Sequence, residues 1–126
     1  MGDLSPYFSR SEFSCGCSCG FGFEYGDVDV ELLALLDRMR EILGAPIYIS
    51  HNGGCRCGVC NEEVGGVDNS AHSRGMAADL KVTGGWERRK MIDAAVVAGA
   101  AGIGVANGFV HVDVCDVKPR PSAWGY

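Results

Sequence analysis

The 126-residue sequence is poor in histidine, proline and tryptophan, with three, four and two of these residues, and it contains no long hydrophobic run. A membrane-spanning helix needs about 20 consecutive apolar residues, so we expect no membrane insertion. A basic excess is also absent, because 11 lysines and arginines stand against 16 aspartates and glutamates. This balance argues against a nucleic-acid partner. The N-terminal residues MGDLSPYFSRSEF lack the basic and then apolar layout of a secretory signal peptide.

Glycine and cysteine, in contrast, are abundant, with 19 and 7 residues. The length and the 47% of hydrophobic residues fit one globular domain over residues 1–126. Seven is an odd number, so a complete set of disulfides would leave one thiol over. Without an export signal, clustered cysteines more often bind metal than form disulfides.

The hydrophobic pattern predicts an α+β fold with a small, mainly antiparallel central sheet and two main helices. Apolar residues at three- and four-residue steps predict a helix over 28–43, capped by Asp27 and ended by Gly44. A second helix is predicted over 86–98. Strands are predicted at 47–50, 76–82, 103–106 and 109–115, with Asn107-Gly108 as a hairpin turn. Residues 1–27 are expected to form a cysteine-rich loop region packed on the domain.

Two histidines and one aspartate form a candidate metal site. His72 precedes the strand predicted at 76–82, Asp79 lies within it, and His111 lies within the closing strand. If these strands pair, two imidazoles and a carboxylate converge and leave a fourth tetrahedral position for water, as in a catalytic zinc site. A hydrogen-bonded core histidine and a structural aspartate would explain the same residues, so spacing alone leaves both interpretations open.

The segment SAHSRGMAADL resembles the S-x-H-x-x-G-x-A-x-D motif of zinc D-alanyl-D-alanine carboxypeptidases, and GFVHVDV followed by Trp124 resembles their second ligand segment. The upstream segments SEFSCGCSCG, PIYIS and CRCGVCNEEVGGVDNSAH are similar to the small phage and prophage branch of this family. The resemblance extends from about Phe8 to Trp124. It implies the fold shared by the Hedgehog signalling domain and the vancomycin-resistance D,D-dipeptidases.

This resemblance also implies a function and a site. The expected function is a zinc peptidase that hydrolyses a bond in peptidoglycan stem peptides through metal-activated water. His72, Asp79 and His111 match the zinc ligands, while Ser70 and Arg56 match residues that hold the substrate. A guanidinium suits that task because it binds a carboxylate through two parallel hydrogen bonds.

The general base is where the sequence departs from the family. Better-known members have an acidic residue three positions before the second histidine ligand or a histidine two positions before it, and here these positions are Gly108 and Phe109. Asp113 is the nearest ionisable candidate on the same strand face as His111. It would serve either as the catalytic base or as an acceptor that orients the imidazole. His51 is a further candidate, with a solvated loop histidine as the simpler interpretation.

Six cysteines form two clusters, C-x-C-x-C at 15–19 and C-x-C-x-x-C at 55–60. The second cluster has a cysteine, Cys60, where the related branch often has a histidine, and these two residues replace each other as zinc ligands. We therefore expect a second, structural zinc bound by Cys57 and Cys60 together with two of Cys15, Cys17 and Cys19. Disulfides and free thiols are the alternatives. We expect the seventh, Cys115, to be a small buried residue.

The sequence thus predicts a single-domain zinc peptidase with peptidoglycan as its partner. The missing signal peptide fits a phage or prophage enzyme that stays in the host cytoplasm until lysis, or one carried in the virion. The alternative is a catalytically weak or inactive zinc-stabilised structural or binding domain, for example in a phage assembly. A cysteine-based metal or redox protein is a weaker third interpretation.

Overall fold

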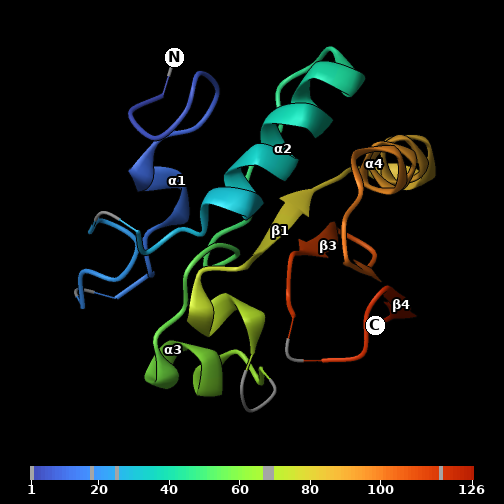
Figure 1. Ribbon diagram of the computed structural model, residues 1–126. Coiled ribbons are helices and arrows are strands. Elements are labelled where there is room, and N and C mark those ends of the chain that lie inside the picture. Colours follow the sequence, from blue (N-terminus) through green and yellow to red (C-terminus); the bar gives the residue numbers. More distant parts are fainter. Residues whose placement is uncertain (1, 18, 25, 67–69, 117) are drawn as a thin grey trace.

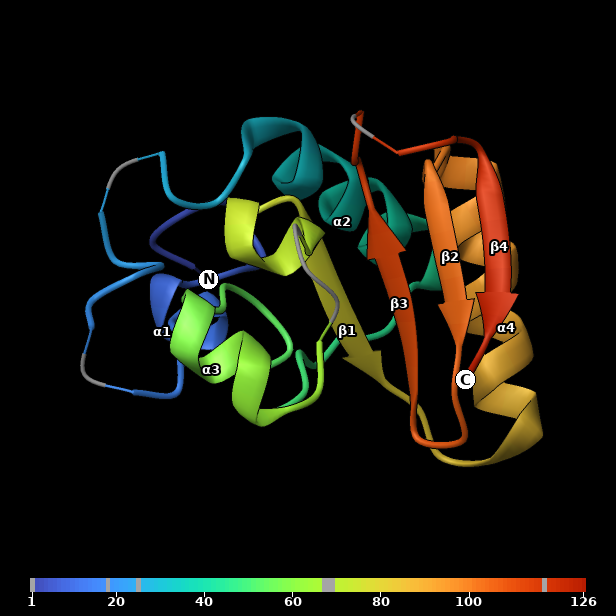
Figure 2. The ribbon, with the colours of Figure 1, turned by 90° about the horizontal axis from the view of Figure 1, so that it is seen from below.

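The computed structural model describes residues 2–17, 19–24, 26–66, 70–116 and 118–126. Four strands form one sheet in the order β1-β3-β2-β4, and helices α2 and α4 lie together behind one face of it (Figures 1 and 2). The helices are α1 (Arg10–Phe13), α2 (Val30–Leu43), α3 (Gly58–Glu63), the 3-10 helix η1 (Ala71–Arg74) and α4 (Gly84–Ala98). The strands are β1 (Ala77–Lys81), β2 (Gly102–Val105), β3 (Phe109–Asp113) and β4 (Ser122–Gly125). Within the described residues, no helix has both the length and the apolar character needed to cross a membrane.

The α+β fold class predicted from the sequence is confirmed, and the hairpin of β2 and β3 forms around Asn107-Gly108. Strand β3 pairs antiparallel with both β1 and β2. Strand β4 was not predicted, and its parallel pairing with β2 makes the sheet mixed. The strand predicted at 47–50 is reduced to a single bridge between Ile49 and Leu80. The loop region 1–27 contains the short helix α1.

Helix α2 begins two residues later than the sequence predicts. Its N-cap is Asp29, whose side chain accepts a hydrogen bond from the Glu31 N–H, so the prediction of Asp27 as the cap was wrong. Asp27 instead accepts hydrogen bonds from the backbone N–H groups of Gly22 and Glu24 in the preceding loop. The helix ends as predicted, because Gly44 adopts the left-handed conformation that stops a helix.

The two faces of the sheet divide the core from the polar site. On one face, Leu80, Val110 and Val112 are fully buried in a hydrophobic cluster with residues of α2 and α4. Successive side chains of a strand alternate between faces, so Asp79 and His111 lie on the opposite face. The hydrophobic cluster on one face therefore supports a sheet whose other face carries the polar residues.

Gly75 is a position where the fold needs glycine. It ends η1 with φ of +68°, and a Cβ built there would lie 1.7 Å from the Asp27 carbonyl oxygen. Gly75→Ala should therefore be penalised twice, by the left-handed backbone and by the steric clash. We predict that the clash alone lowers the free energy of unfolding by about 1–3 kcal/mol. Gly44→Ala is the matched control, because Gly44 has φ of +66° and nothing within 4 Å. Chemical denaturation measures both variants, and equal losses of unfolding free energy would contradict the steric argument.

Candidate active site

The structure brings together the three residues predicted to bind the catalytic metal. Asp79 and His111 face each other across the β1–β3 pair, and η1 places His72 beside them. The Asp79 Oδ1 atom lies 3.2 Å from His72 Nε2 and 3.2 Å from His111 Nδ1. Ligand atoms bound at 2.0–2.1 Å to a tetrahedral zinc lie about 3.3 Å apart. The donor set and its spacing therefore fit one zinc ion.

Each imidazole is held by a hydrogen bond on its other ring nitrogen. The Nδ1 atom of His72 lies 2.9 Å from the Gly54 carbonyl oxygen, and the Nε2 atom of His111 lies 2.7 Å from Asp113 Oδ2. Since a carbonyl and a carboxylate only accept, these nitrogens donate. In the neutral imidazoles that a metal ion needs, the lone pairs of His72 Nε2 and His111 Nδ1 then face the shared position. Such bonds fix the tautomer and orientation of metal-binding histidines.

Asp113 lies behind His111 and is completely buried. Besides the His111 ring, it accepts two hydrogen bonds from the Arg120 guanidinium, at 3.1 Å and 2.8 Å, and one from the Cys115 N–H. Burial raises the pKa of Asp113, but the bonds from His111 and Arg120 outweigh it and hold the pKa well below its usual value. These contacts match the orienting role, the second of the two roles that the sequence suggested for Asp113.

The carboxylates and imidazoles of the candidate metal site stabilise one another's charged forms. Burial raises the pKa of Asp79, yet the hydrogen bonds with His111 and His72 outweigh burial and keep the pKa well below its normal range. Burial lowers the pKa of His111, and the bonds to Asp113 and Asp79 raise it above its usual value. The carboxylate of Asp79 is thus ionised at neutral pH, as a metal ligand must be.

Glycines of β2 leave room for this arrangement. Gly102 pairs with Asp113 and Gly104 with His111 in the β2–β3 register. A Cβ at Gly102 would lie 2.4 Å from Asp113 Oδ2, and one at Gly104 would lie 2.6 Å from the indole nitrogen of Trp124. The side chains of Asp113 and Trp124, from the strands on either side, can therefore cover β2.

A cavity of about 580 Å³ opens beside the three ligand residues. Among the predicted substrate residues, Arg56 and Ser70 both line it. The Ser70 hydroxyl oxygen accepts a hydrogen bond from the His72 N–H and so caps η1. The buried Nε of Arg56 has no hydrogen-bond partner among the described residues. Burial lowers the Arg56 pKa, against the opposing effect of Asp79.

Sequence reasoning missed the contribution of the C-terminal segment. Arg120 binds Asp113 and lies over the Trp124 ring at 5.1 Å. The Trp124 ring in turn lies 5.1 Å from the His111 ring, and Tyr126 contacts Phe109 at the cavity wall. The pairing of β4 with β2 positions these side chains. Of this set, only the packing of Trp124 on the sheet was expected.

His51 lies apart from this site. It is exposed and lines a separate depression that contains Asn52 and Lys81. The interpretation as an exposed loop histidine fits this position.

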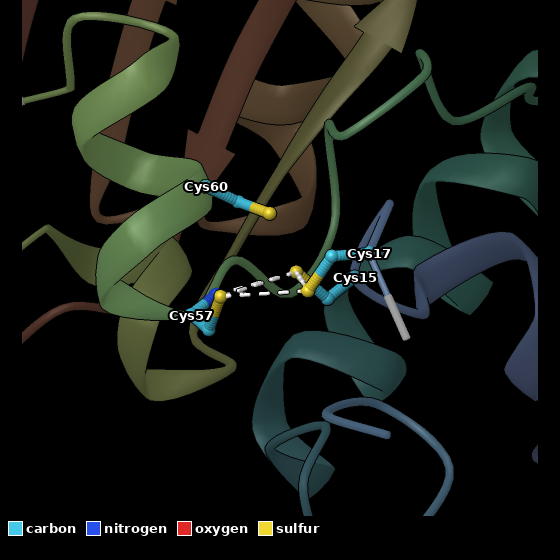
Figure 3. Close-up of side chains that lie close together, drawn as sticks. All are labelled: Cys15, Cys17, Cys57 and Cys60. Atoms are coloured by element: carbon cyan, nitrogen blue, oxygen red, sulfur yellow. Dashed lines mark hydrogen bonds between the residues drawn. The ribbon is translucent and has the colours of Figure 1, made fainter. Parts of the chain in front are cut away.

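Of the predicted cysteine ligands, the structure brings together Cys15, Cys17, Cys57 and Cys60, whose sulfur atoms all lie within 4.8 Å of one another (Figure 3). Cys19 is exposed and lies outside this group of four, although its thiol interacts with those of Cys15, Cys17 and Cys57. Cys55 points into the core, where burial raises its pKa to about 12. Cys115 is buried beside Ala71 and Ala77, as expected for a small apolar residue.

The family profile of Peptidase M15 matches residues 6–113. The chain belongs to the Peptidase M15 family. Membership implies a zinc-dependent peptidase, and the three converging ligand atoms agree with that chemistry. A search of curated proteins finds no match. The M15 match ends at Asp113, so Arg120 and Trp124 lie beyond the matched residues.

Proposed function

We propose that this M15 protein hydrolyses a peptide bond in bacterial peptidoglycan stem peptides. The observation that carries the proposal is the convergence of His72 Nε2, Asp79 Oδ1 and His111 Nδ1 at 3.2 Å spacings beside a substrate-sized cavity. When bound there, zinc supplies polarisation of the scissile carbonyl and activation of water.

Cationic side chains outnumber carboxylates among the described residues that line the cavity, although the chain as a whole has a net charge of −5. Arg56, Lys118 and Arg120 line it, and Arg120 is already paired with Asp113. Arg56 has a buried nitrogen without a partner among the described residues, which is costly until an acceptor arrives. A carboxylate supplies that acceptor, and peptidoglycan stem peptides carry carboxylates at their ends and side chains. Arg56 therefore binds the substrate carboxylate in our proposal.

Digestion of purified peptidoglycan by the zinc-loaded protein tests this function. Mass spectrometry of the products is expected to show new amine and carboxyl ends, and the masses identify a carboxypeptidase, a D,D-endopeptidase or an L-Ala-D-Glu endopeptidase. His111→Ala is the control and should give no products. Absence of new ends from the wild type, with zinc shown to be bound, would refute the proposal.

One observation favours a second candidate, a zinc-stabilised domain that binds the cell wall without cleaving it. Residues 108 and 109 offer no proton acceptor, and both carboxylates among the described cavity residues, Asp79 and Asp113, are bonded to imidazoles. The digestion separates the two functions if peptidoglycan binding is measured in parallel by co-sedimentation. Binding without products supports the second candidate.

We predict that Arg56→Met raises the KM for a peptide with a free carboxylate about 10- to 100-fold, because a hydrogen bond to a charged group contributes about 1.5–3 kcal/mol. We expect kcat to change little if Arg56 binds the ground state and the transition state equally. Steady-state kinetics on matched carboxylate and amidated peptides measures the effect, which should vanish for the amide. Arg74→Met removes the same charge from an exposed position and should leave KM unchanged. An equal loss on both peptides would contradict this role.

A further inference from the structure

The four-cysteine group lies apart from the histidine site and combines two distant segments of the chain. Cys15 and Cys17 follow α1, while Cys57 is the N-cap of α3 and Cys60 lies in its first turn. The Sγ atoms of Cys15, Cys17 and Cys57 are each 3.7 Å from the other two. In Figure 3 the Cys60 side chain extends from α3 toward these three sulfurs.

The distances distinguish a metal site from disulfides. A disulfide joins two sulfurs at about 2.05 Å. Thiolates bound at about 2.3 Å to a tetrahedral zinc lie about 3.8 Å apart. The three equal separations of 3.7 Å therefore match the edges of one zinc tetrahedron, and the sulfur of Cys60 is placed to complete it.

The backbone around the cysteines is shaped for this convergence. The Asn52 side chain accepts a hydrogen bond from the Gly16 N–H at 2.7 Å, and a Cβ at Gly16 would lie 2.1 Å from the Asn52 side-chain oxygen. A larger residue between Cys15 and Cys17 would displace the Asn52 side chain from this hydrogen bond. The Cys57 N–H also donates to Cys15 Sγ at 3.4 Å, which links the two segments directly.

We propose that Cys15, Cys17, Cys57 and Cys60 bind a structural zinc ion that fastens the N-terminal segment to the loop before α3. Four protein ligands close the coordination shell, so this ion has no open position for a substrate.

The same loop reaches the candidate active site. The Gly54 carbonyl accepts the hydrogen bond from His72 Nδ1, and the Arg56 N–H donates to the His72 carbonyl at 3.1 Å. Residues 54–57 therefore connect the two sites. Gly54 holds the ring of His72, and Cys57 is a ligand of the structural zinc. The structural zinc positions both the His72 ring and the Arg56 side chain.

Metal content tests the proposal independently of peptidase activity. We expect two zinc ions per wild-type chain purified under reducing conditions, and one per chain in Cys17→Ser. Cys19→Ser is the matched control, since Cys19 is also exposed and lies two residues away, and it should retain two. His111→Ala should also retain one, and the variant with both Cys17→Ser and His111→Ala should retain none.

Thiol labelling of the wild type keeps the test valid if Cys17→Ser does not fold. Cys17 and Cys19 are both exposed, yet only Cys17 belongs to the group of four. With zinc bound, we expect Cys17 to be alkylated at least tenfold more slowly than after a chelator has removed the metal, while the rate at Cys19 should change far less. Equal labelling of Cys17 with and without the chelator, a wild-type chain with a single zinc that His111→Ala removes, or equal zinc loss in Cys17→Ser and Cys19→Ser would overturn the proposal.

Discussion

Replacing His72 by alanine is expected to remove one metal ion per chain and to lower peptidase turnover at least about 10³-fold. The reason is that a metal ion contributes several kcal/mol of transition-state stabilisation, and each 1.4 kcal/mol corresponds to a factor of ten in rate. His72 is 2% exposed, and its Nδ1 atom is hydrogen-bonded to the Gly54 carbonyl. Its Nε2 atom faces Asp79 and is therefore the nitrogen available to the metal. Metal analysis by mass spectrometry and steady-state kinetics on the same preparation measure the two effects.

His51→Ala is the matched control for this prediction. It removes an imidazole of equal size from an exposed position outside the cavity. We expect it to retain both the metal and the turnover of the wild type. If His72→Ala retained its full metal content, the ligand set of His72, Asp79 and His111 would be wrong.

Those parts of the fold that depend on local signals could be predicted from the sequence. The Asn107-Gly108 turn specifies the hairpin of β2 and β3, and the leucine pattern with Gly44 specifies α2 and its end. Alternation along each strand predicts which residues share a face, and the pairing of the two strands then brings Asp79 opposite His111. Convergence of the metal ligands was therefore predictable once β1 and β3 were assumed to pair.

The remaining features depend on contacts between distant residues. Strand β4 pairs in parallel with β2, and nothing within residues 122–125 signals a partner some 20 residues earlier. Arg120 has its role only because Gly102 leaves space for it beside Asp113. The order of residues along the chain does not show that a glycine of one strand leaves room for a side chain that follows another strand.

The choice among the N-terminal cysteines depends on a contact that the sequence does not reveal. The spacing of Cys15, Cys17 and Cys19 makes any two of them possible ligands. The structure groups the first two with Cys57 and Cys60, and Asn52, 36 residues along the chain, accepts a hydrogen bond from the Gly16 N–H in the turn between them. Similarly, Asp29 rather than Asp27 caps α2, since Asp27 is engaged by the Gly22 N–H in the preceding loop.

Replacing Asp113 by asparagine is expected to weaken zinc binding at the histidine site about 10- to 100-fold, as loss of such supporting groups does elsewhere. The same variant should lose about 3–5 kcal/mol of unfolding free energy, because the largely buried Arg120 is left at the cavity wall without its counter-charge. Zinc titration with a competing chelator and chemical denaturation measure these effects. Asp93→Asn is the matched control: it breaks the exposed ion pair with Arg89 and should affect stability far less and zinc affinity not at all.

The dependence of turnover on zinc separates the two roles suggested for Asp113. If Asp113 orients His111, saturating zinc should restore most of the turnover of Asp113→Asn, because only the affinity has fallen. If Asp113 is instead the general base, zinc affinity should be normal and kcat should fall about 10²–10⁴-fold at every zinc concentration. Adding Arg120→Met to Asp113→Asn removes both halves of the buried pair and should recover part of the lost stability. The full burial of Asp113 and its bonds to His111, Arg120 and the Cys115 N–H favour the first result.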